Sequence, residues 1–223
     1  MAPKLKKHGA DRCRLMIGVT GGSGSGKSLF AQALAARLRP RTVVVISEDD
    51  YYYRRPEGPG RDPARFDFDA PSARDHPHLA AHLSQLRKGQ TIARPIYSFR
   101  IHAPLKRTAA TAPGEVVIVE GLHVLHDPHV RGLLDFSLFL EVDDDVRFIR
   151  RLLRDTRERG RSMRSVVEHY LSTVKPAHDR FVEPVRELAS LVLSRDGAGG
   201  ASDEAILERW LDVTLEGLGK VGL

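Results

Sequence analysis

The chain has 223 residues, of which 41% are hydrophobic and 29% are charged, and its formal net charge is +6. This length suits one large α/β domain, and a single cysteine excludes an internal disulfide framework and fits a reducing cytosol. No apolar run approaches the roughly 20 residues that span a bilayer, so we expect a cytoplasmic protein without a membrane partner. Because no aromatic-interleaved basic patch accompanies the positive charge, we favour anionic small ligands and expect no nucleic-acid partner.

Short aliphatic runs alternate with helical patterns along the chain. We expect a basic flexible tail over residues 1–14 and a single domain over residues 15–223. The runs predicted as buried strands are 15–20, 42–47, 116–120, 136–142 and 190–194. The predicted helices are 27–38, 78–86, 127–134, 144–159, 162–174 and 202–218. Strands that alternate with helices predict an α/β fold with a doubly wound parallel sheet.

Two segments interrupt this alternation. Residues 54–65 are rich in proline, glycine and arginine and predict a long loop. Residues 91–107 contain short extended pieces interrupted by Pro95 and Pro104, and we expect a small β-hairpin flap outside the main sheet. Segments this long in a compact domain are usually functional or disordered.

A glycine-rich segment, GGSGSGKS, joins the first predicted strand to the first predicted helix and fits G-x-x-x-x-G-K-[ST]. Its glycines let successive backbone N–H groups point at phosphate oxygens, and the helix that begins there adds its positive end. Lys27 would reach the β- and γ-phosphates, and the Ser28 hydroxyl would ligate magnesium. We therefore predict a P-loop for the triphosphate of ATP or GTP with Mg²⁺, formed by Gly21, Gly22, Ser23, Gly24, Ser25, Gly26, Lys27 and Ser28.

Acidic residues follow two of the predicted strands. Glu120 ends the strand at 116–120, where a carboxylate would lie in the ligand crevice and hold magnesium directly or through water. The strand at 42–47 runs into EDDYYY, whose acids would lie near the γ-phosphate and accept the proton of an acceptor hydroxyl. The aromatic rings would pack against a flat acceptor. An acidic turn that only caps a helix is the alternative interpretation of this segment.

Seven arginines lie around Gly160: Arg147, Arg150, Arg151, Arg154, Arg157, Arg159 and Arg161. The first four share one face of the predicted helix. A charged stripe is usually a solvated face, but arginines on both sides of a helix–glycine–helix break predict a lid. We expect this lid, residues 147–162, to close over the phosphates and supply guanidinium groups to the charge that develops during transfer.

Taken together, these motifs resemble the uridine–cytidine kinases of the phosphoribulokinase/uridine kinase group of P-loop kinases. The resemblance runs from about residue 15 to residue 197 and rests on GGSGSGKS, SEDDYYY, FDFDAP, PIYSF with His102, VVIVEG, RRLLRDTRERGRS and YLSTVKPAHDRFVEP. It implies a homo-oligomer, often a tetramer, and an adenine-contacting loop at residues 194–197. It also implies a catalytic base at Asp49 with Tyr52 nearby, a ribose-binding acid at Asp69, pyrimidine contacts from Tyr97, Phe99 and His102, acceptor contacts from Arg151 and Arg161, and lid groups Arg154 and Arg159.

The chain also departs from this family pattern. His169 replaces a glutamine that contacts the nucleoside, and Ala70 replaces a histidine. The leading prediction is transfer of the ATP γ-phosphate to the 5′-hydroxyl of uridine or cytidine. One alternative is another small alcohol, such as a phosphorylated sugar or a pantothenate-like acid, which the arginines of residues 54–65 would favour. Another is a nucleotide-dependent binding or regulatory protein without transfer activity.

Overall fold

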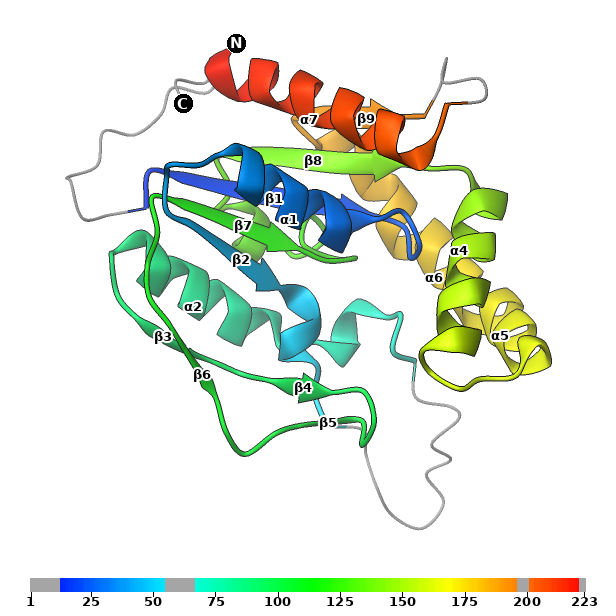
Figure 1. Cartoon of the computed structure of the whole chain (residues 1–223). Helices are drawn as coiled ribbons and strands as arrows, with labels where there is room; N and C mark the ends of the chain where they lie inside the picture. Colours follow the sequence, from blue (N-terminus) through cyan, green and yellow to red (C-terminus); the bar gives the residue numbers. More distant parts are fainter. Residues whose placement is uncertain (1–12, 55–66, 196–200, 221–223) are drawn as a thin grey trace.

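A computed structural model of the chain describes residues 13–54, 67–195 and 201–220. Five parallel strands form one sheet in the order β2-β7-β1-β8-β9 (Figure 1). Their bounds are Leu15–Gly21 for β1, Val43–Ser47 for β2, Val116–Glu120 for β7, Phe136–Glu141 for β8 and Leu191–Ser194 for β9. In register, Ile17 of β1 pairs with Ile118 of β7 and with Phe136 of β8. The predicted parallel α/β sheet is confirmed.

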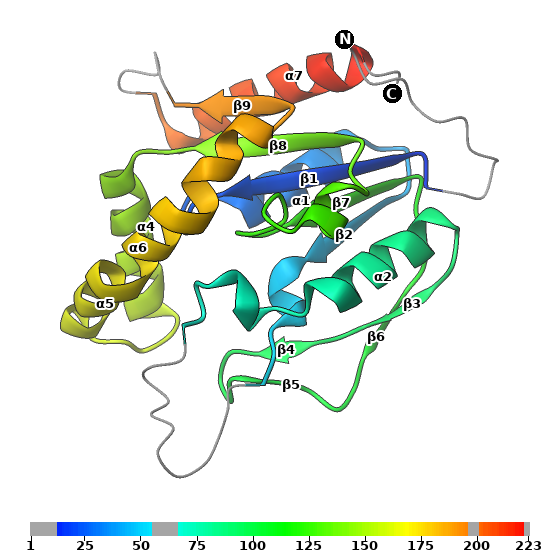
Figure 2. The ribbon, with the colours of Figure 1, turned by 180° about the vertical axis from the view of Figure 1, so that it is seen from behind.

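Helices cover both faces of the sheet. Helices α1 (Lys27–Arg37) and α7 (Asp203–Lys220) lie on one face, and α2 (His76–Arg87), α3 (Pro128–Arg131) and α6 (Lys175–Ala177) lie on the other (Figures 1 and 2). Alternate residues of β1 explain this arrangement, because Ile17 joins the core under α1 and α7 whereas Met16 joins the core under α2. Within the first core, the rings of Phe30 and Trp210 meet edge to face at 6.4 Å.

The helix predicted at 162–174 is longer and less regular in the structure. Helix α5 (Met163–His169) continues through a π turn (Tyr170–Val174), α6, a second π turn (His178–Val182) and a 3₁₀ segment (Glu183–Leu188). Pro176 and Pro184 lie just after the two π turns. Proline lacks an amide hydrogen and its ring crowds the preceding turn, so the backbone widens there without ending the helix.

The segment between α2 and β7 forms two small antiparallel pairs outside the main sheet. Strand β3 (Ile92–Arg94) pairs with β6 (Ala109–Thr111), and β4 (Tyr97–Ser98) pairs with β5 (Ala103–Pro104). The paired region therefore extends four residues beyond the predicted flap, which ended at residue 107. Helices α4 (Asp144–Arg157) and α5 project from the carboxyl edge of the sheet, on the side to which the strand arrows point (Figure 1).

Parts of the predicted tail and loops lie outside the described residues, namely 1–12, 55–66 and 196–200. Of the predicted tail, Cys13 is fully buried against the α2 core and the Arg14 amide donates to the Glu115 carbonyl at 2.8 Å. These two residues are therefore part of the folded domain. Within the described ranges, no helix combines the length and the apolar character needed to cross a bilayer.

The contact between α1 and α7 gives a first prediction. Replacing Phe30 with alanine should lower the free energy of unfolding by about 3–5 kcal/mol, because it removes a buried ring and leaves a cavity against Trp210. Urea denaturation followed by circular dichroism measures this change. The control is Leu29→Ala at the neighbouring, 65% exposed position, which should change the free energy of unfolding by less than about 0.5 kcal/mol. Equal effects of the two substitutions would contradict this packing.

Candidate functional site

The P-loop connects β1 to α1 at the carboxyl edge of the sheet. Gly24 and Gly26 have φ values of +85° and +92°, which place them in the left-handed region that glycine adopts easily. The side chain of Lys27 folds back over the loop, and its Nζ donates to the carbonyls of Gly21 and Gly22 at 2.9 Å each. Burial lowers the pKa of Lys27 to about 8. This lysine is thus a desolvated cation held at the loop that would receive phosphate.

Two observations in this loop fit a bound phosphate. Ser25 Oγ is buried and finds no hydrogen-bond partner within the described part of the chain. Helix α1 also begins at this loop, and the amides at its N-terminus favour an anion there. The residues present therefore fit a polyphosphate ligand.

Glu120 lies at the end of β7, next to Ser47 at the end of β2. The Ser47 hydroxyl donates to Glu120 Oε1 at 2.8 Å, and Ser28 also hydrogen-bonds this carboxylate. Burial, followed by repulsion from Asp49, raises the pKa of Glu120. A cation beside Ser28 and Glu120 would offset the burial of the Glu120 carboxylate and its repulsion by Asp49. Hydroxyl and carboxylate oxygens are also the ligands that Mg²⁺ prefers.

The described ranges contain no group of three or more His, Cys, Asp or Glu side chains able to hold a metal ion. This agrees with the way Mg²⁺ usually binds beside nucleotides, through one or two protein oxygens together with phosphates and water. Ser28 and Glu120 therefore fit a magnesium ion that arrives with a nucleotide, and they do not form a complete cage of their own.

Most of the predicted site residues line one pocket next to the P-loop. This pocket is bounded by Ser23, Gly24, Lys27, Ser28, Asp49, Tyr52, Phe68, Asp69, Phe99, His102, Glu120, Gly121, Leu122, Arg151, Arg154, Arg159, Arg161 and His169. Tyr97 is absent from this wall. It is buried behind it, with its ring centroid 5.2 Å from those of Tyr52 and Phe99. Tyr97 thus supports the aromatic wall from behind.

Asp49 reaches this pocket from the short 3₁₀ turn that follows β2, η1 (Glu48–Tyr51). Its neighbour Glu48 points the other way and is fully buried. Glu48 accepts from His76 Nε2 at 2.8 Å and from the His123 amide at 3.0 Å, and it lies 3.3 Å from Arg74 Nε. Burial opposes ionisation of Glu48, but Arg74 and the hydrogen bond from His76 outweigh it and lower the pKa to about 2.

Sequence reasoning missed this buried network of Glu48, Arg74, His76 and His123. Its one visible signal was Glu48, an acid that directly follows a buried strand. Arg74, His76 and His123 lie in segments where no local pattern marks them. His123 Nε2 donates to the Asp69 carbonyl at 2.8 Å, and burial lowers the pKa of His123 to about 3, so this ring is neutral at physiological pH.

The arginines of the predicted lid are organised by one buried acid, Asp155, which sequence reasoning also missed. Asp155 has no exposed surface, and four guanidinium groups lie within 4 Å of its carboxylate. These are Arg154 at 2.9 Å, Arg151 and Arg159 at 3.6 Å, and Arg161 at 3.9 Å. The visible signal was a single acid in the run RRLLRDTRERGR. Because four cations share one carboxylate, the group keeps an excess of positive charge beside the pocket.

Arg151 links this group to the acceptor end of the pocket. It donates to Ser23 Oγ at 2.7 Å and to His169 Nδ1 at 3.3 Å, and it lies 3.7 Å from Asp69 Oδ1. Another arginine of the group, Arg159, lies over the hairpin, with its guanidinium 5.0 Å from the centre of the Phe99 ring. The arginine group therefore contacts both the P-loop and the hairpin.

Two of the seven arginines have other partners. Arg150 pairs with Asp203 of α7 at 2.6 Å. Arg147 is buried behind the P-loop, where its Nε donates to the Val142 carbonyl at 2.9 Å and its guanidinium contacts Asp144. A Cβ added at Gly22 would lie 2.2 Å from Arg147 Nη1, so a larger residue there would displace this guanidinium group. Arg147 thus supports the loop and does not reach the pocket described above.

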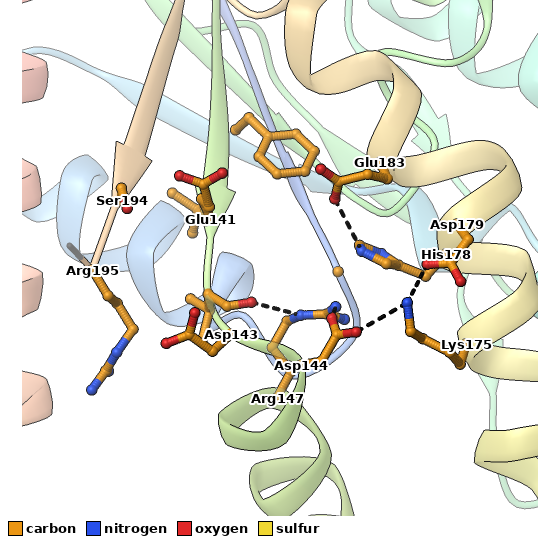
Figure 3. Close-up of a pocket in the computed structure, with 14 residues that line it drawn as sticks. Glu141, Asp143, Asp144, Arg147, Lys175, His178, Asp179, Glu183, Ser194 and Arg195 are labelled. Carbon is orange, nitrogen blue, oxygen red and sulfur yellow. Dashed lines mark hydrogen bonds and ion pairs between the residues drawn. The ribbon is translucent and has the colours of Figure 1, made fainter.

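A second crevice, of about 440 Å³, opens on the other side of the P-loop between the ends of β8 and β9, α4 and α6 (Figure 3). Polar contacts line it: Lys175 forms an ion pair with Asp144 at 3.0 Å, and His178, whose pKa is lowered by burial to about 4, lies 3.2 Å from Glu183 as a neutral ring. The Lys175–Asp144 pair joins α4 to the helix behind the sheet, whereas His178 and Glu183 both belong to that helix. Arg147 of this crevice lies beside Gly22 and so supports the P-loop from this side.

Comparison with known proteins agrees with this geometry. The family model described as the phosphoribulokinase/uridine kinase family matches residues 16–199. Proteins named uridine kinase are 40% identical in Listeria monocytogenes over 183 residues (82% of this chain, 88% of that protein) and 38% identical in Clostridium perfringens over 199 residues (89% and 96%). A solved structure of a possible uridine kinase from Bacillus stearothermophilus shares the fold, with a TM-score of 0.61 at 20% identity (84% and 90% covered). The chain belongs to the phosphoribulokinase/uridine kinase family.

The buried carboxylate of Glu48 gives a prediction for pH dependence. Its pKa in the folded protein, about 2, lies below the ordinary value of 4.5, so ionised Glu48 stabilises the fold above pH 4.5. This contribution, on the order of 3 kcal/mol, is lost as the pH falls from 4.5 towards 2. Glu48→Gln should therefore be less stable at pH 7, by about 3–5 kcal/mol, and should lose less stability on acidification.

Urea denaturation at pH 7, 4.5 and 2.5 measures this difference. Glu208→Gln is the matched control, because Glu208 is 61% exposed in its pair with Arg37 and should contribute less than about 1 kcal/mol. If Glu48→Gln kept the acid sensitivity of the unmodified protein, the ion pair with Arg74 would not carry the stability assigned to it.

Proposed function

We propose that this chain transfers the γ-phosphate of ATP to the 5′-hydroxyl of a pyrimidine nucleoside, uridine or cytidine. One observation supports the proposal most: a single pocket holds the P-loop lysine, Asp49, Glu120, an aromatic wall and a group of arginines. This set supplies phosphate binding at one end and a proton acceptor with a ring-binding surface at the other. The uridine kinase names of its relatives support the choice of acceptor.

On the donor side, the P-loop amides and Lys27 would bind the triphosphate, and Ser28 and Glu120 would hold Mg²⁺. When bound, Mg²⁺ neutralises charge on the phosphate oxygens and so favours transfer. Lys27 is already desolvated, so its attraction for phosphate oxygens is weakened little by water. We propose ATP as the donor, and GTP is its alternative.

On the acceptor side, Asp49 would orient the 5′-hydroxyl and accept its proton as the new O–P bond forms. Asp69, which is 6% exposed and lines the same pocket, would accept hydrogen bonds from ribose hydroxyls. Phe99 and His102 of the hairpin, with Tyr52, would enclose the pyrimidine ring, and Arg151, Arg161 and His169 would complete the contacts with the acceptor.

Arg154 and Arg159 would act over the phosphates. Their guanidinium groups are held beside the pocket by Asp155 and would stabilise the charge that spreads over the transferred group. Arg159, which follows α4, contacts Phe99 of the hairpin, and this contact would keep water from the reacting atoms. The tetramer implied by the family resemblance and the cytoplasmic location expected from the composition stay predictions.

A panel of acceptors with labelled ATP and GTP tests this proposal. Uridine and cytidine should yield labelled monophosphates, whereas a phosphorylated sugar and pantothenate should yield little product. A panel in which neither nucleoside is phosphorylated would overturn the assignment, and the acceptor that is phosphorylated would replace it.

The role of Asp49 gives a separate prediction. Asp49→Asn should lower kcat with uridine by more than about 100-fold, because the amide cannot take the hydroxyl proton. The binding of ATP, measured by calorimetry, should change little, since Lys27 and the P-loop are intact. Asp75→Asn is the control, because Asp75 caps α2 through the His78 amide and asparagine caps a helix equally well. Activity of Asp49→Asn within about tenfold of the unmodified enzyme would exclude this base.

A further inference from the structure

Arg74 lies directly beside the carboxylate proposed as the catalytic base. It follows a short 3₁₀ turn, η3 (Pro71–Ala73), and its side chain is completely buried. We propose that Arg74 is a positioning residue that fixes Asp49, and with it the loop that carries Asp69, in the arrangement that phosphoryl transfer requires. This inference rests on the proposed function, because it assigns a role to a residue behind that site.

The guanidinium group of Arg74 bridges the two parts of the acceptor site. Its Nη2 donates to Asp49 Oδ1 at 3.1 Å and to the Tyr52 hydroxyl. Its Nη1 donates to the carbonyls of Phe68 at 3.1 Å and Ala70 at 3.5 Å. These two residues flank Asp69. One planar cation therefore sets the distance between the proposed base and the acid proposed to hold the ribose.

The surroundings of Arg74 make this bridge rigid. The guanidinium carbon lies 4.1 Å from the centre of the Tyr52 ring, and Glu48, with no exposed side-chain surface, neutralises the charge from the other side. A buried cation cannot swing into water without giving up these partners. Asp49, in contrast, has a side chain that is 42% exposed and lines the pocket. Arg74 therefore anchors one carboxylate oxygen and leaves the other for the acceptor hydroxyl.

A competing cation explains why such an anchor is needed. Lys27 also attracts Asp49 across the pocket, and a direct pair between them would occupy both the phosphate-binding ammonium and the base. Arg74 holds Asp49 on the acceptor side and leaves Lys27 available for phosphate. Arginine suits this task better than lysine, because its planar fork can bind Asp49 and the Phe68 carbonyl at the same time.

A mutant cycle on Arg74 and Asp49 tests the inference by steady-state kinetics with uridine and ATP. Arg74→Met should lower kcat by about 30- to 100-fold, since a misplacement of about 1 Å at a reacting group can cost 100-fold, while KM for ATP stays within about twofold. Arg74→Lys should recover part of this loss. In the Asp49→Asn background, Arg74→Met should lower the residual rate by clearly less than in the unmodified background, because the base that it positions is already absent and only the loop that carries Asp69 can still shift.

Arg87→Met provides the matched control. Arg87 also pairs with a carboxylate, Asp135 at 2.7 Å, but it lies at the end of α2 and does not line the pocket. This control should lower the melting temperature and leave kcat within about twofold. A folded Arg74→Met enzyme with unchanged kcat, or an equal loss in the Asp49→Asn background, would overturn the inference. If Arg74→Met does not fold, Arg74→Lys takes its place in the same cycle.

A crystal structure of the Arg74 variant separates this inference from the proposed function. The Asp49 carboxylate should turn towards Lys27 once the anchor is removed, and an Asp49 that keeps its place would contradict the anchoring role whatever the enzyme phosphorylates. If the unmodified enzyme phosphorylates no nucleoside, the proposed function fails, and the same mutant cycle is then run with the acceptor identified in the panel.

Discussion

The buried ammonium group of Lys27 is the charge around which the other groups of the site are arranged. Desolvation disfavours the charged form of this lysine, and attraction by Glu120, Asp49 and Glu48 offsets part of that cost. These acids also repel one another, and repulsion from Asp49 adds to the effect of burial in raising the pKa of Glu120. The arrangement is therefore balanced only when further cations, such as Arg74 or a metal ion beside Glu120, hold the acids apart.

The structure uses the same device on both sides of the pocket. Glu48 and Asp155 are both fully buried acids that pair with arginines. Without these acids, the arginines would repel nearby cations or turn towards water. Glu48 holds a single arginine that supports the proposed base. Asp155 is shared by four arginines, so positive charge remains in excess there. The first arrangement fixes geometry, whereas the second provides a field suited to phosphate groups.

Local patterns in the sequence predicted the sheet, most helices and the P-loop, because strand burial and the glycine loop are each encoded in fewer than about twenty consecutive residues. The buried network escaped prediction because Glu48, Arg74 and His123 lie on separate segments and meet only in the fold. Arg147 shows a second limit. Its spacing matched the other arginines of the stripe, yet its position at the start of α4 turns it behind the loop and not over the pocket.

The packing of the only tryptophan in the sequence has a spectroscopic consequence. Trp210 lies against Phe30 of α1, the helix that begins at Lys27, and its Nε1 donates to the Ser194 carbonyl at the end of β9 at 3.0 Å. Indole emission responds to hydrogen bonding and to nearby packing. The intrinsic fluorescence of this protein is therefore a label-free reporter located between the P-loop helix and the last strand of the sheet, free of background from any other indole.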